Sequence, residues 1–404
     1  MVGSGGREHA LASVLSRTAE VVVTPGNPGI PGSVDTEPEA IEADLFVIGP
    51  EAPLVDGLAD RLRAAGRLVF GPGADGAQLE GSKAWMKELL VDAGVPTAAH
   101  GAFTDVQRAM QFLDTMAPPF VVKTDGLAAG KGVLVTESLT EARNAVEDYL
   151  SGAAFGDAGR RLVIEEGLVG PELSVLAICD GERAWALPPA RDFKRALEGD
   201  EGPNTGGMGA YSPVPAAPAE LLDVVMGDFV EPTLATLRSR GIDYRGVLYA
   251  GLMLTPSGPK MLEYNVRFGD PETQVVLPRL ESDLAALLAG AAAGGLDTPI
   301  TWSDDAVVTV VCASEGYPTA PRTGDPISGL DAAMAIDGVE VFCAGVAADG
   351  DSLVTSGGRV LNVTGRGPTI ADARARAMAG VAEISWPGMQ YRSDIALDAS
   401  AVSS

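Results

Sequence analysis

The chain has 404 residues, of which 46% are hydrophobic and 21% charged, and its formal net charge is −26. This length suggests roughly two to four domains, and the composition excludes a disordered chain. Such an acidic surface repels phosphates and argues against nucleic acid or an anionic membrane as a partner. Any phosphate ligand must therefore be held locally. Three cysteines without C-x-x-C spacing and only two histidines exclude a disulfide framework and Cys- or His-rich metal centres.

The first residues contain no apolar run typical of a signal peptide, and the apolar stretch 284–296 is too short to span a bilayer. We therefore expect a cytoplasmic protein without a membrane partner. Only six lysines accompany 23 arginines, and five of the six fall between positions 83 and 194. A lysine is a compact point charge, so these are candidates for phosphate contacts. The alternative is that they are ordinary solvated surface lysines, which we expect for roughly half of them.

Up to about residue 75, predicted strands alternate with predicted helices, which indicates a parallel sheet. The glycine loop 3–6 leads into a helix over 7–15. Strands are predicted over 21–23, 45–49 and 68–71, and a helix over 54–65. Parallel sheets bind ligands at the carboxyl ends of their strands, which here are the loops 3–9, 26–29 and 49–54.

Ser82 is the expected N-cap of a helix over 83–93, which Gly94 ends. The glycine-rich cluster 202–209 is expected to form a loop, and the last hundred residues read as short strands and one amphipathic helix. We find no internal repeat. Strands are predicted over 120–123, 132–135, 163–166, 172–178, 246–254, 260–266, 307–312, 339–342, 352–355 and 359–363, and the late helix over 370–384.

The stretch Gly126-Leu-Ala-Ala-Gly130-Lys131-Gly132 is similar to a phosphate-binding loop. It is not a Walker loop, because three residues separate the first two glycines and Gly132 stands where Ser or Thr is required. Since it joins two strands of a predicted hairpin, its amides would cover the phosphates as a flap. Taken alone, a structural hairpin tip explains the loop somewhat better. Lys123, just before it, shifts the interpretation toward nucleotide binding.

Glu263, Asn265 and Arg267 alternate along a predicted strand, so they lie on one face. A carboxylate and an amide oxygen are suitable ligands for Mg²⁺ that bridges nucleotide phosphates, and Arg267 could neutralise an anion beside it. A solvated polar face on an edge strand is the alternative for such a short pattern.

The turn Gly5-Gly6-Arg7 at the start of a helix could bind an anion through its amides and the helix dipole. A simple tight turn explains it equally well. Because the third glycine of a dinucleotide fingerprint and a ribose-binding acid are missing, we do not expect NAD to bind here.

Over essentially its whole length the chain resembles the phosphoribosylamine–glycine ligases (glycinamide ribonucleotide synthetases) of the ATP-grasp superfamily. Each motif is modest alone, but their joint order is highly specific. The matching stretches are GSGGREHALA (3–12), PGNPG (25–29), GPEAPLV (49–55), LEGSKA (79–84), VKTDGLAAGKGV (122–133), VIEEGLVGPELS (163–174), GPNTGGMGAYSP (202–213), LEYNVRFGDPET (262–273), YPTAPRTGD (317–325), SGGRVLNVT (356–364) and YRSDIA (391–396).

The resemblance implies a multidomain α/β and α+β fold. An N-terminal parallel α/β domain (1–78) would precede an ATP-grasp domain (79–299) with a small lid over about 100–165, and a C-terminal mixed β domain (300–404) would follow. It also implies ATP-dependent ligation of glycine to 5-phosphoribosylamine through glycyl phosphate, in de novo purine biosynthesis, with Mg²⁺ or Mn²⁺. The alternatives are another ATP-grasp carboxylate–amine ligase and a catalytically silent nucleotide-binding paralogue. We expect a monomer, with a dimer as the alternative.

The resemblance also assigns roles to residues. ATP would be bound by Lys83, Lys123, Gly126, Gly130, Lys131, Gly132, Glu165, Glu166, Leu168 and Glu172, and the metal by Glu263 and Asn265. The substrates would be bound by Gly5, Gly6, Arg7, Glu51, Asn204, Thr205, Gly206 and Asp270. Arg267, Lys194 and Asp192 would be catalytic.

Three features depart from the family pattern. Only Met1 and Val2 precede the glycine loop, and the segment between Gly29 and Asp44 is short, as if one β–α unit were trimmed. These two departures bear on the stability of the N-terminal domain and on whether Met1 is the true start. Third, Arg191-Asp192-Phe193-Lys194-Arg195 stands where the family usually has Gln-Asp-His-Lys-Arg, so that Asp192, Lys194 and Arg195 are retained and Phe193 replaces histidine.

Overall fold

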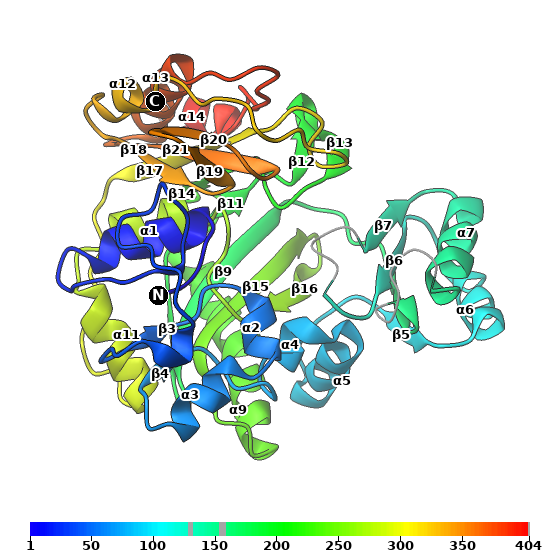
Figure 1. Ribbon diagram of the computed structural model, residues 1–404. Coiled ribbons are helices and arrows are strands. Elements are labelled where there is room, and N and C mark those ends of the chain that lie inside the picture. The colour runs from blue at the N-terminus through cyan, green and yellow to red at the C-terminus, as the bar shows by residue number, and fades with distance from the viewer. Residues whose placement is uncertain (128–131, 153–158, 403–404) are drawn as a thin grey trace.

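The computed structural model describes residues 1–127, 132–152 and 159–402 (Figure 1). In the N-terminal part, strand β1 (Val2–Gly3) pairs in parallel with β2 (Thr24–Pro25), and β3 (Phe46–Val47) with β4 (Val69–Phe70). A parallel bridge between Val2 and Ile48 joins the two pairs. The predicted parallel sheet is therefore confirmed.

Two predictions in this part are wrong in detail. The valine run 21–23 is not a strand, because only Val23 is buried in a small core and β2 begins after it. The helix predicted over 54–65 is split into α2 (Glu51–Val55) and α3 (Leu58–Ala64). Gly57 lies between them with φ +77°, a left-handed conformation that glycine adopts without steric cost and that interrupts a helix. The helix α1 (Gly6–Leu15) forms as predicted.

An antiparallel sheet in the order β10-β9-β15-β16 forms the middle of the molecule. Its strands are β10 (Ala184–Ala186), β9 (Glu172–Asp180), β15 (Arg245–Thr255) and β16 (Gly258–Asn265). Helix α5 (Lys83–Ala93) packs on β16, and its ends agree with the prediction. The Ser82 side chain accepts a hydrogen bond from the Trp85 amide, and Gly94 ends the helix with φ +70°.

A smaller unit projects sideways from this body (Figure 1). Its sheet has the order β5-β8-β6-β7, with strands β5 (His100–Phe103), β8 (Leu162–Glu166), β6 (Phe120–Thr124) and β7 (Val133–Thr136). Helices α6 (Val106–Leu113) and α7 (Leu139–Leu150) cover it and share with it a separate hydrophobic core. The predicted hairpin is confirmed as β6 and β7, which pair antiparallel.

The last sheet has the order β11-β14-β17-β21-β18, and all its pairings are antiparallel. It includes β11 (Arg191–Asp192) and β14 (Gly209–Ser212) beside β17 (Ala306–Ala313), β21 (Arg359–Gly367) and β18 (Val339–Cys343). The expectation of a plain loop over 202–209 is therefore wrong at both ends: β13 (Glu201–Asn204) pairs with β12 (Arg195–Leu197), and β14 begins at Gly209.

The remaining elements complete the chain. They are η1 (Pro38–Ala40), α4 (Gln78–Gly81), η3 (Glu198–Asp200), α8 (Ala219–Val225), η4 (Met226–Val230), α9 (Glu231–Ser239), α10 (Thr273–Val276), η5 (Leu277–Arg279), α11 (Leu284–Ala293), α12 (Leu330–Met334), β19 (Val346–Asp349), β20 (Ser352–Thr355), α13 (Ile370–Glu383) and α14 (Leu397–Val402). None of the helices in the described part of the chain has both the length and the apolarity needed to cross a bilayer.

Candidate active site

The end of β16 carries the predicted polar face. Tyr264 and Val266 are each 1% exposed and pack in the core, so the alternation predicted from the sequence is confirmed. On the other face, Nη2 of Arg267 donates to Oδ1 of Asn265 at 3.1 Å. Asn265 thus lies with its side-chain oxygen directed at a fixed cation two residues along the chain.

Glu263 lies in a strongly positive environment. Burial on its own would raise the pKa of this carboxyl, but positive charges nearby outweigh it and hold the pKa below its usual value. The cations that produce this effect are Lys123, Lys194, Lys83 and Arg267. Glu263 is therefore ionised at neutral pH and lies among the side chains best suited to bind phosphate oxygens.

The two predicted phosphate-binding lysines reach this region from different elements. Lys83, in the first turn of α5, donates to the carbonyl of Gly126 at 2.9 Å. Lys123, near the end of β6, is buried, and its Nζ lies 3.0 Å from Oε1 of Glu165. Gly126 has φ +138°, and the Gly132 carbonyl accepts from the Thr124 amide at 2.8 Å. Gly130 and Lys131 lie outside the described residues.

The predicted adenine and ribose residues follow along β8 and the start of β9. The side chain of Glu165 is 2% exposed and engaged by lysines, and its backbone pairs with β5 and β6. Oε1 of Glu166 accepts from Lys260 at 2.8 Å and from the Ala99 amide at 3.1 Å. Leu168 lies between the two strands, and Glu172, 4.0 Å from Lys194 Nζ, begins β9.

The glycine-rich segment after β13 is held against Lys194. Nζ of Lys194 lies 2.6 Å from Oδ2 of Asp192, whose side chain is buried. Both the amide and the hydroxyl of Thr205 donate to the Lys194 carbonyl, at 2.7 and 2.8 Å. The Gly206 amide donates to the Tyr317 hydroxyl, while Asn204 at the end of β13 is exposed. The predicted catalytic pair and the predicted substrate loop therefore form one unit.

The N-terminal loop contributes a further group of charged side chains. Arg7 is buried and donates from Nε to Glu8 at 2.5 Å and from Nη1 to the Phe268 carbonyl at 3.2 Å. The other carboxylate oxygen of Glu8 accepts from the Gly5 amide at 2.6 Å, and Gly6 is the first residue of α1. In the turn predicted to bind an anion, the Gly5 amide and the Arg7 side chain are therefore already hydrogen-bonded within the protein.

Two more predicted substrate residues lie beside this loop. Glu51, at the start of α2, accepts from Nε of Arg267 at 3.1 Å. Asp270 accepts from Nη2 of Arg359 at 3.0 Å, and a Cβ at Gly5 would come 3.8 Å from its carboxylate. Residues from three parts of the chain thus converge on the segment that follows β16.

Sequence reasoning gave no specific role to three charged residues of this region, although Lys87 is one of the lysines considered for phosphate contacts. Lys87 lies one helical turn after Lys83 on α5, a spacing that places both on one helix face and could have identified it. Oε1 of Glu80 accepts from Arg267 at 2.9 Å, and Arg359 donates to the Gly206 and Asp270 carbonyls, each at 2.8 Å. These contacts of Glu80 and Arg359 join positions far apart in sequence, so no local pattern points to them.

Phe193, the departure from the family pattern, packs between two arginines. Its ring centre lies 5.1 Å from the guanidinium carbon of Arg392 and 5.7 Å from that of Arg191. Arg392 is 1% exposed and ion-paired with Asp394. An aromatic face at position 193 therefore stabilises a buried guanidinium and does not disturb the Asp192–Lys194 pair next to it.

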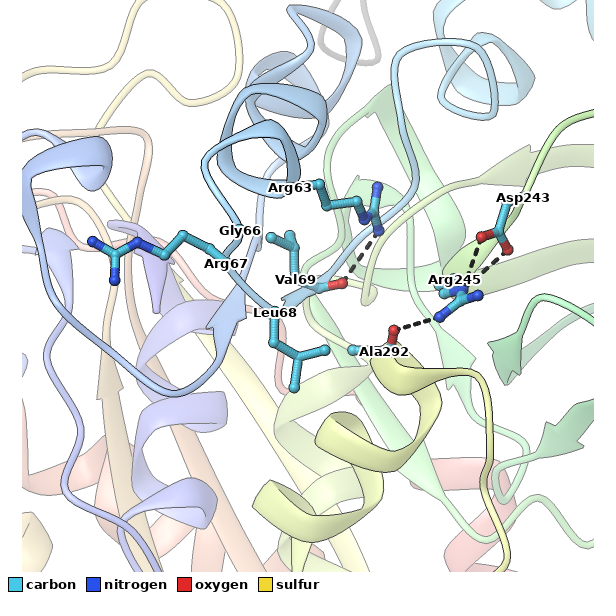
Figure 2. A pocket seen from close by; sticks show the side chains of 8 residues that line it. All are labelled: Arg63, Gly66, Arg67, Leu68, Val69, Asp243, Arg245 and Ala292. Carbon is cyan, nitrogen blue, oxygen red and sulfur yellow. Dashed lines mark hydrogen bonds and ion pairs between the residues drawn. The ribbon is translucent and has the colours of Figure 1, made fainter.

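A separate cavity of about 370 Å³ contains none of the predicted site residues. Figure 2 shows Arg63 and Arg245 beside it, both already hydrogen-bonded to the protein. Arg63 donates to the Val69 carbonyl, and Arg245 pairs with Asp243 and donates to the Ala292 carbonyl. The cavity therefore does not belong to the group of residues around β16.

The residues around β16 are suited to a metal that arrives with a ligand. Among the described residues, no group of three or more His, Cys, Asp or Glu side chains could hold a metal by itself. Glu263 and Asn265 offer one carboxylate and one amide oxygen, and Mg²⁺ is commonly held by one or two carboxylates together with substrate phosphates. The donor set therefore fits a nucleotide-bound Mg²⁺ or Mn²⁺.

Comparison with known proteins identifies the relatives of the chain. The phosphoribosylglycinamide synthetase family matches in three parts: its N domain over residues 1–80, its ATP-grasp (A) domain over 81–273 and its C domain over 307–398. Phosphoribosylamine–glycine ligase of Streptomyces coelicolor is 48% identical over 419 residues, covering 99% of this chain and 98% of that protein. The Caulobacter vibrioides protein of the same name is also 48% identical, with 98% and 96% covered.

Solved structures agree with these sequence relatives. The crystal structure of phosphoribosylamine–glycine ligase from Thermotoga maritima superposes with a TM-score of 0.87 at 35% identity, covering 98% of each chain. Biotin carboxylase from Campylobacter jejuni superposes with a TM-score of 0.69 at 14% identity, covering 96% of this chain and 92% of that one, and this likeness shows the fold alone. The predicted fold class is confirmed. By sequence and by fold, the chain belongs to the phosphoribosylglycinamide synthetase family of ATP-grasp enzymes.

Proposed function

We propose that this protein joins glycine to 5-phosphoribosylamine in de novo purine biosynthesis, with ATP converted to ADP and phosphate. The observation that carries the proposal is that Lys83, Lys123, Lys194 and Arg267 lie near enough to the Glu263 carboxylate to lower its pKa. In a chain of net charge −26, this local group of cations supports the binding of a polyphosphate. The names of the relatives support glycine and phosphoribosylamine as the other two substrates.

The reaction has two steps. A carboxylate oxygen of glycine bonds to the γ-phosphorus of ATP while the bond from that phosphorus to ADP breaks, which gives glycyl phosphate. The amine of phosphoribosylamine then bonds to the acyl carbon, phosphate leaves and the nitrogen loses a proton. The first step brings two anions together, so charge neutralisation matters more than acid–base catalysis, and a site of lysines and arginines without histidine suits it.

Within this scheme, Lys83 and Lys123 hold the phosphates of ATP, and the segment 126–132 covers them. The backbone at 165–168 frames the adenine, and Glu172 binds the ribose hydroxyls. The flap and the projecting unit exclude water, because an acyl phosphate in contact with water hydrolyses. Glu263 and Asn265 would hold a Mg²⁺ or Mn²⁺ ion that arrives with the nucleotide. When bound, the metal neutralises charge on the phosphate oxygens.

The transfer of the acyl group takes place beside Arg267, Lys194 and Asp192. Arg267 is fixed by Glu51 and Glu80, and Asp192 orients Lys194 at 2.6 Å. Both cations are thereby held in place before substrate binds, which reduces the reorganisation that the transition state requires. Phosphoribosylamine binds between the N-terminal loop and the segments that carry Asp270 and Thr205.

We also propose the domain division 1–78, 79–299 with a lid over about 100–165, and 300–404. The separate core of the projecting unit supports the lid, whose strands begin at His100 and end at Glu166. The protein is proposed to act in the cytoplasm as a monomer. Its strongly negative charge supports the proposal that neither nucleic acid nor an anionic membrane is a partner.

An isotope experiment tests the proposed chemistry. Glycine labelled with ¹⁸O in both carboxylate oxygens is incubated with the protein, ATP and phosphoribosylamine, and the products are analysed by mass spectrometry. Transfer through glycyl phosphate places one ¹⁸O in the released phosphate and one in glycinamide ribonucleotide. Unlabelled phosphate would show that the carboxylate does not attack ATP and would overturn the mechanism.

A further inference from the structure

Lys87 is a buried lysine whose partners connect three elements of the site. Its side chain is 1% exposed, and Nζ lies 3.0 Å from Oε2 of Glu165. Nζ also donates to the Thr97 hydroxyl at 2.7 Å, and that hydroxyl donates to the Met261 carbonyl on β16 at 2.7 Å. The other carboxylate oxygen of Glu165 lies 3.0 Å from Lys123. One carboxylate on β8 is therefore shared between two lysines.

The sharing of Glu165 affects the charge that Lys123 presents. A buried Glu165 with Lys123 as its sole partner would form a neutral pair, and the lysine would have little charge left for a phosphate. With Lys87 included, the group of three has a net charge of +1. Burial lowers the pKa of Lys87 to about 8, although the negative charge of Glu165 opposes the shift. A buried ammonium is costly unless it is paired, and Glu165 and the Thr97 hydroxyl supply the partners of Lys87.

We propose that Lys87 is a positioning residue for ATP, which acts through Glu165 on Lys123. It occupies one oxygen of Glu165, so Lys123 is held at the other oxygen and keeps net positive charge toward the polyphosphate. Through Thr97 it also connects β8 of the projecting unit with β16, the strand that carries Glu263. This inference rests on the proposed function, because Lys123 is assigned to ATP there.

The test measures binding of a non-hydrolysable ATP analogue with Mg²⁺ by calorimetry, together with the melting temperature. Lys87→Met removes the charge but keeps the length of the side chain. We expect its dissociation constant for the analogue to rise about tenfold, a usual size for coupling between neighbouring charged groups. Glu88→Gln is the matched control. Glu88 is the next residue of α5, its ion pair with Arg161 is exposed, and the substitution also changes the charge by one unit. Its affinity should stay at the wild-type value.

A double-mutant cycle separates positioning from general stabilisation. If Lys87 acts through Glu165, then Lys87→Met in the Glu165→Gln background should weaken analogue binding by less than twofold. Equal affinity of Lys87→Met and wild type, with only a lower melting temperature, would show a purely structural role and overturn the proposal. So would full additivity in the cycle. Where Lys87→Met does not fold, Lys87→Gln, which keeps a donor without the charge, is judged by the same outcomes.

Analogue binding requires neither glycine nor phosphoribosylamine. The binding result therefore does not depend on which reaction the protein catalyses. If wild-type protein binds the analogue but forms no glycinamide ribonucleotide, the proposed function is wrong, and the binding data still decide the role of Lys87. If wild-type protein does not bind the analogue at all, the assignment of Lys123 and Lys87 to ATP is overturned.

Discussion

Arg7 and Arg267 donate to the same atom, the carbonyl oxygen of Phe268, each at 3.2 Å. Arg7 comes from the N-terminal loop, and Arg267 follows the strand that carries Glu263. The N-terminal part and the ATP-grasp core therefore meet at the Phe268 carbonyl. Two guanidinium groups side by side repel each other unless anions lie near them. Glu8 and Glu51 supply part of that compensation, and a bound phosphate would supply more.

The first prediction concerns Arg7. Because the global field repels phosphates, phosphoribosylamine needs a local cation, and Arg7→Ala should raise its KM by roughly ten- to a hundredfold. The KM values for ATP and glycine should stay near those of wild type. Steady-state kinetics with each substrate varied, together with a thermal melt, decide the point. A lower melting temperature with all three KM values unchanged would show that Arg7 only holds the loop to Glu8 and Phe268.

The second prediction concerns Glu263. Glu263→Ala should bind ATP weakly and lose nearly all turnover, because the one carboxylate proposed for the metal is removed. The variant should remain folded, since the apolar face of β16 formed by Tyr264 and Val266 is unchanged. Circular dichroism and initial rates across a Mg²⁺ titration measure both properties. Activity within a few-fold of wild type at ordinary Mg²⁺ concentration would contradict the metal assignment.

The third prediction concerns pH and His9, which joins α1 to β18. Its Nδ1 accepts from the Cys343 amide at 2.8 Å, and burial lowers the pKa of His9 from 6.5 to about 4. Below pH 6.5 the unfolded chain therefore binds a proton that the folded chain does not. The free energy of unfolding should fall as the pH falls from 6.5 to 4, by up to about 3 kcal/mol from this group.

Urea denaturation at a series of pH values measures this effect. His9→Asn keeps an acceptor close to the position of Nδ1 but has no group that titrates near neutrality, so it isolates the contribution of the imidazole. Wild type should lose more stability than the variant between pH 6.5 and 4. Parallel curves over that interval would contradict the assignment of the pH dependence to His9.

Local signals predicted some elements to the residue. Helix α5 begins after Ser82 and ends before Gly94. Both limits can be predicted locally, because serine is a favoured N-cap residue and glycine readily adopts the left-handed conformation that ends a helix. The polar face of β16 follows from a period of two, which needs no knowledge of the rest of the fold. The break at Gly57 is harder to predict, because a glycine inside a helical pattern is often tolerated.

Contacts between distant segments could not be predicted in this way. Arg359 reaches the Gly206 carbonyl because β21 and β14, which begins three residues after Gly206, both pair with β17 in one sheet, and Gly206 lies in the segment expected to be a plain loop. The pairing of Lys87 with Glu165 depends on how β8 lies against α5. Motifs identified which residues matter to the site, whereas the contacts that orient them follow from tertiary packing.

The most direct test of the account is the substrate dependence of ADP release. Purified protein is mixed with ATP and Mg²⁺ and with glycine, phosphoribosylamine or both, and with bicarbonate in place of glycine as a control. The account predicts rapid ADP release with both substrates present, matched one to one by glycinamide ribonucleotide. ADP release that requires bicarbonate, or no release under any of these conditions, would contradict it.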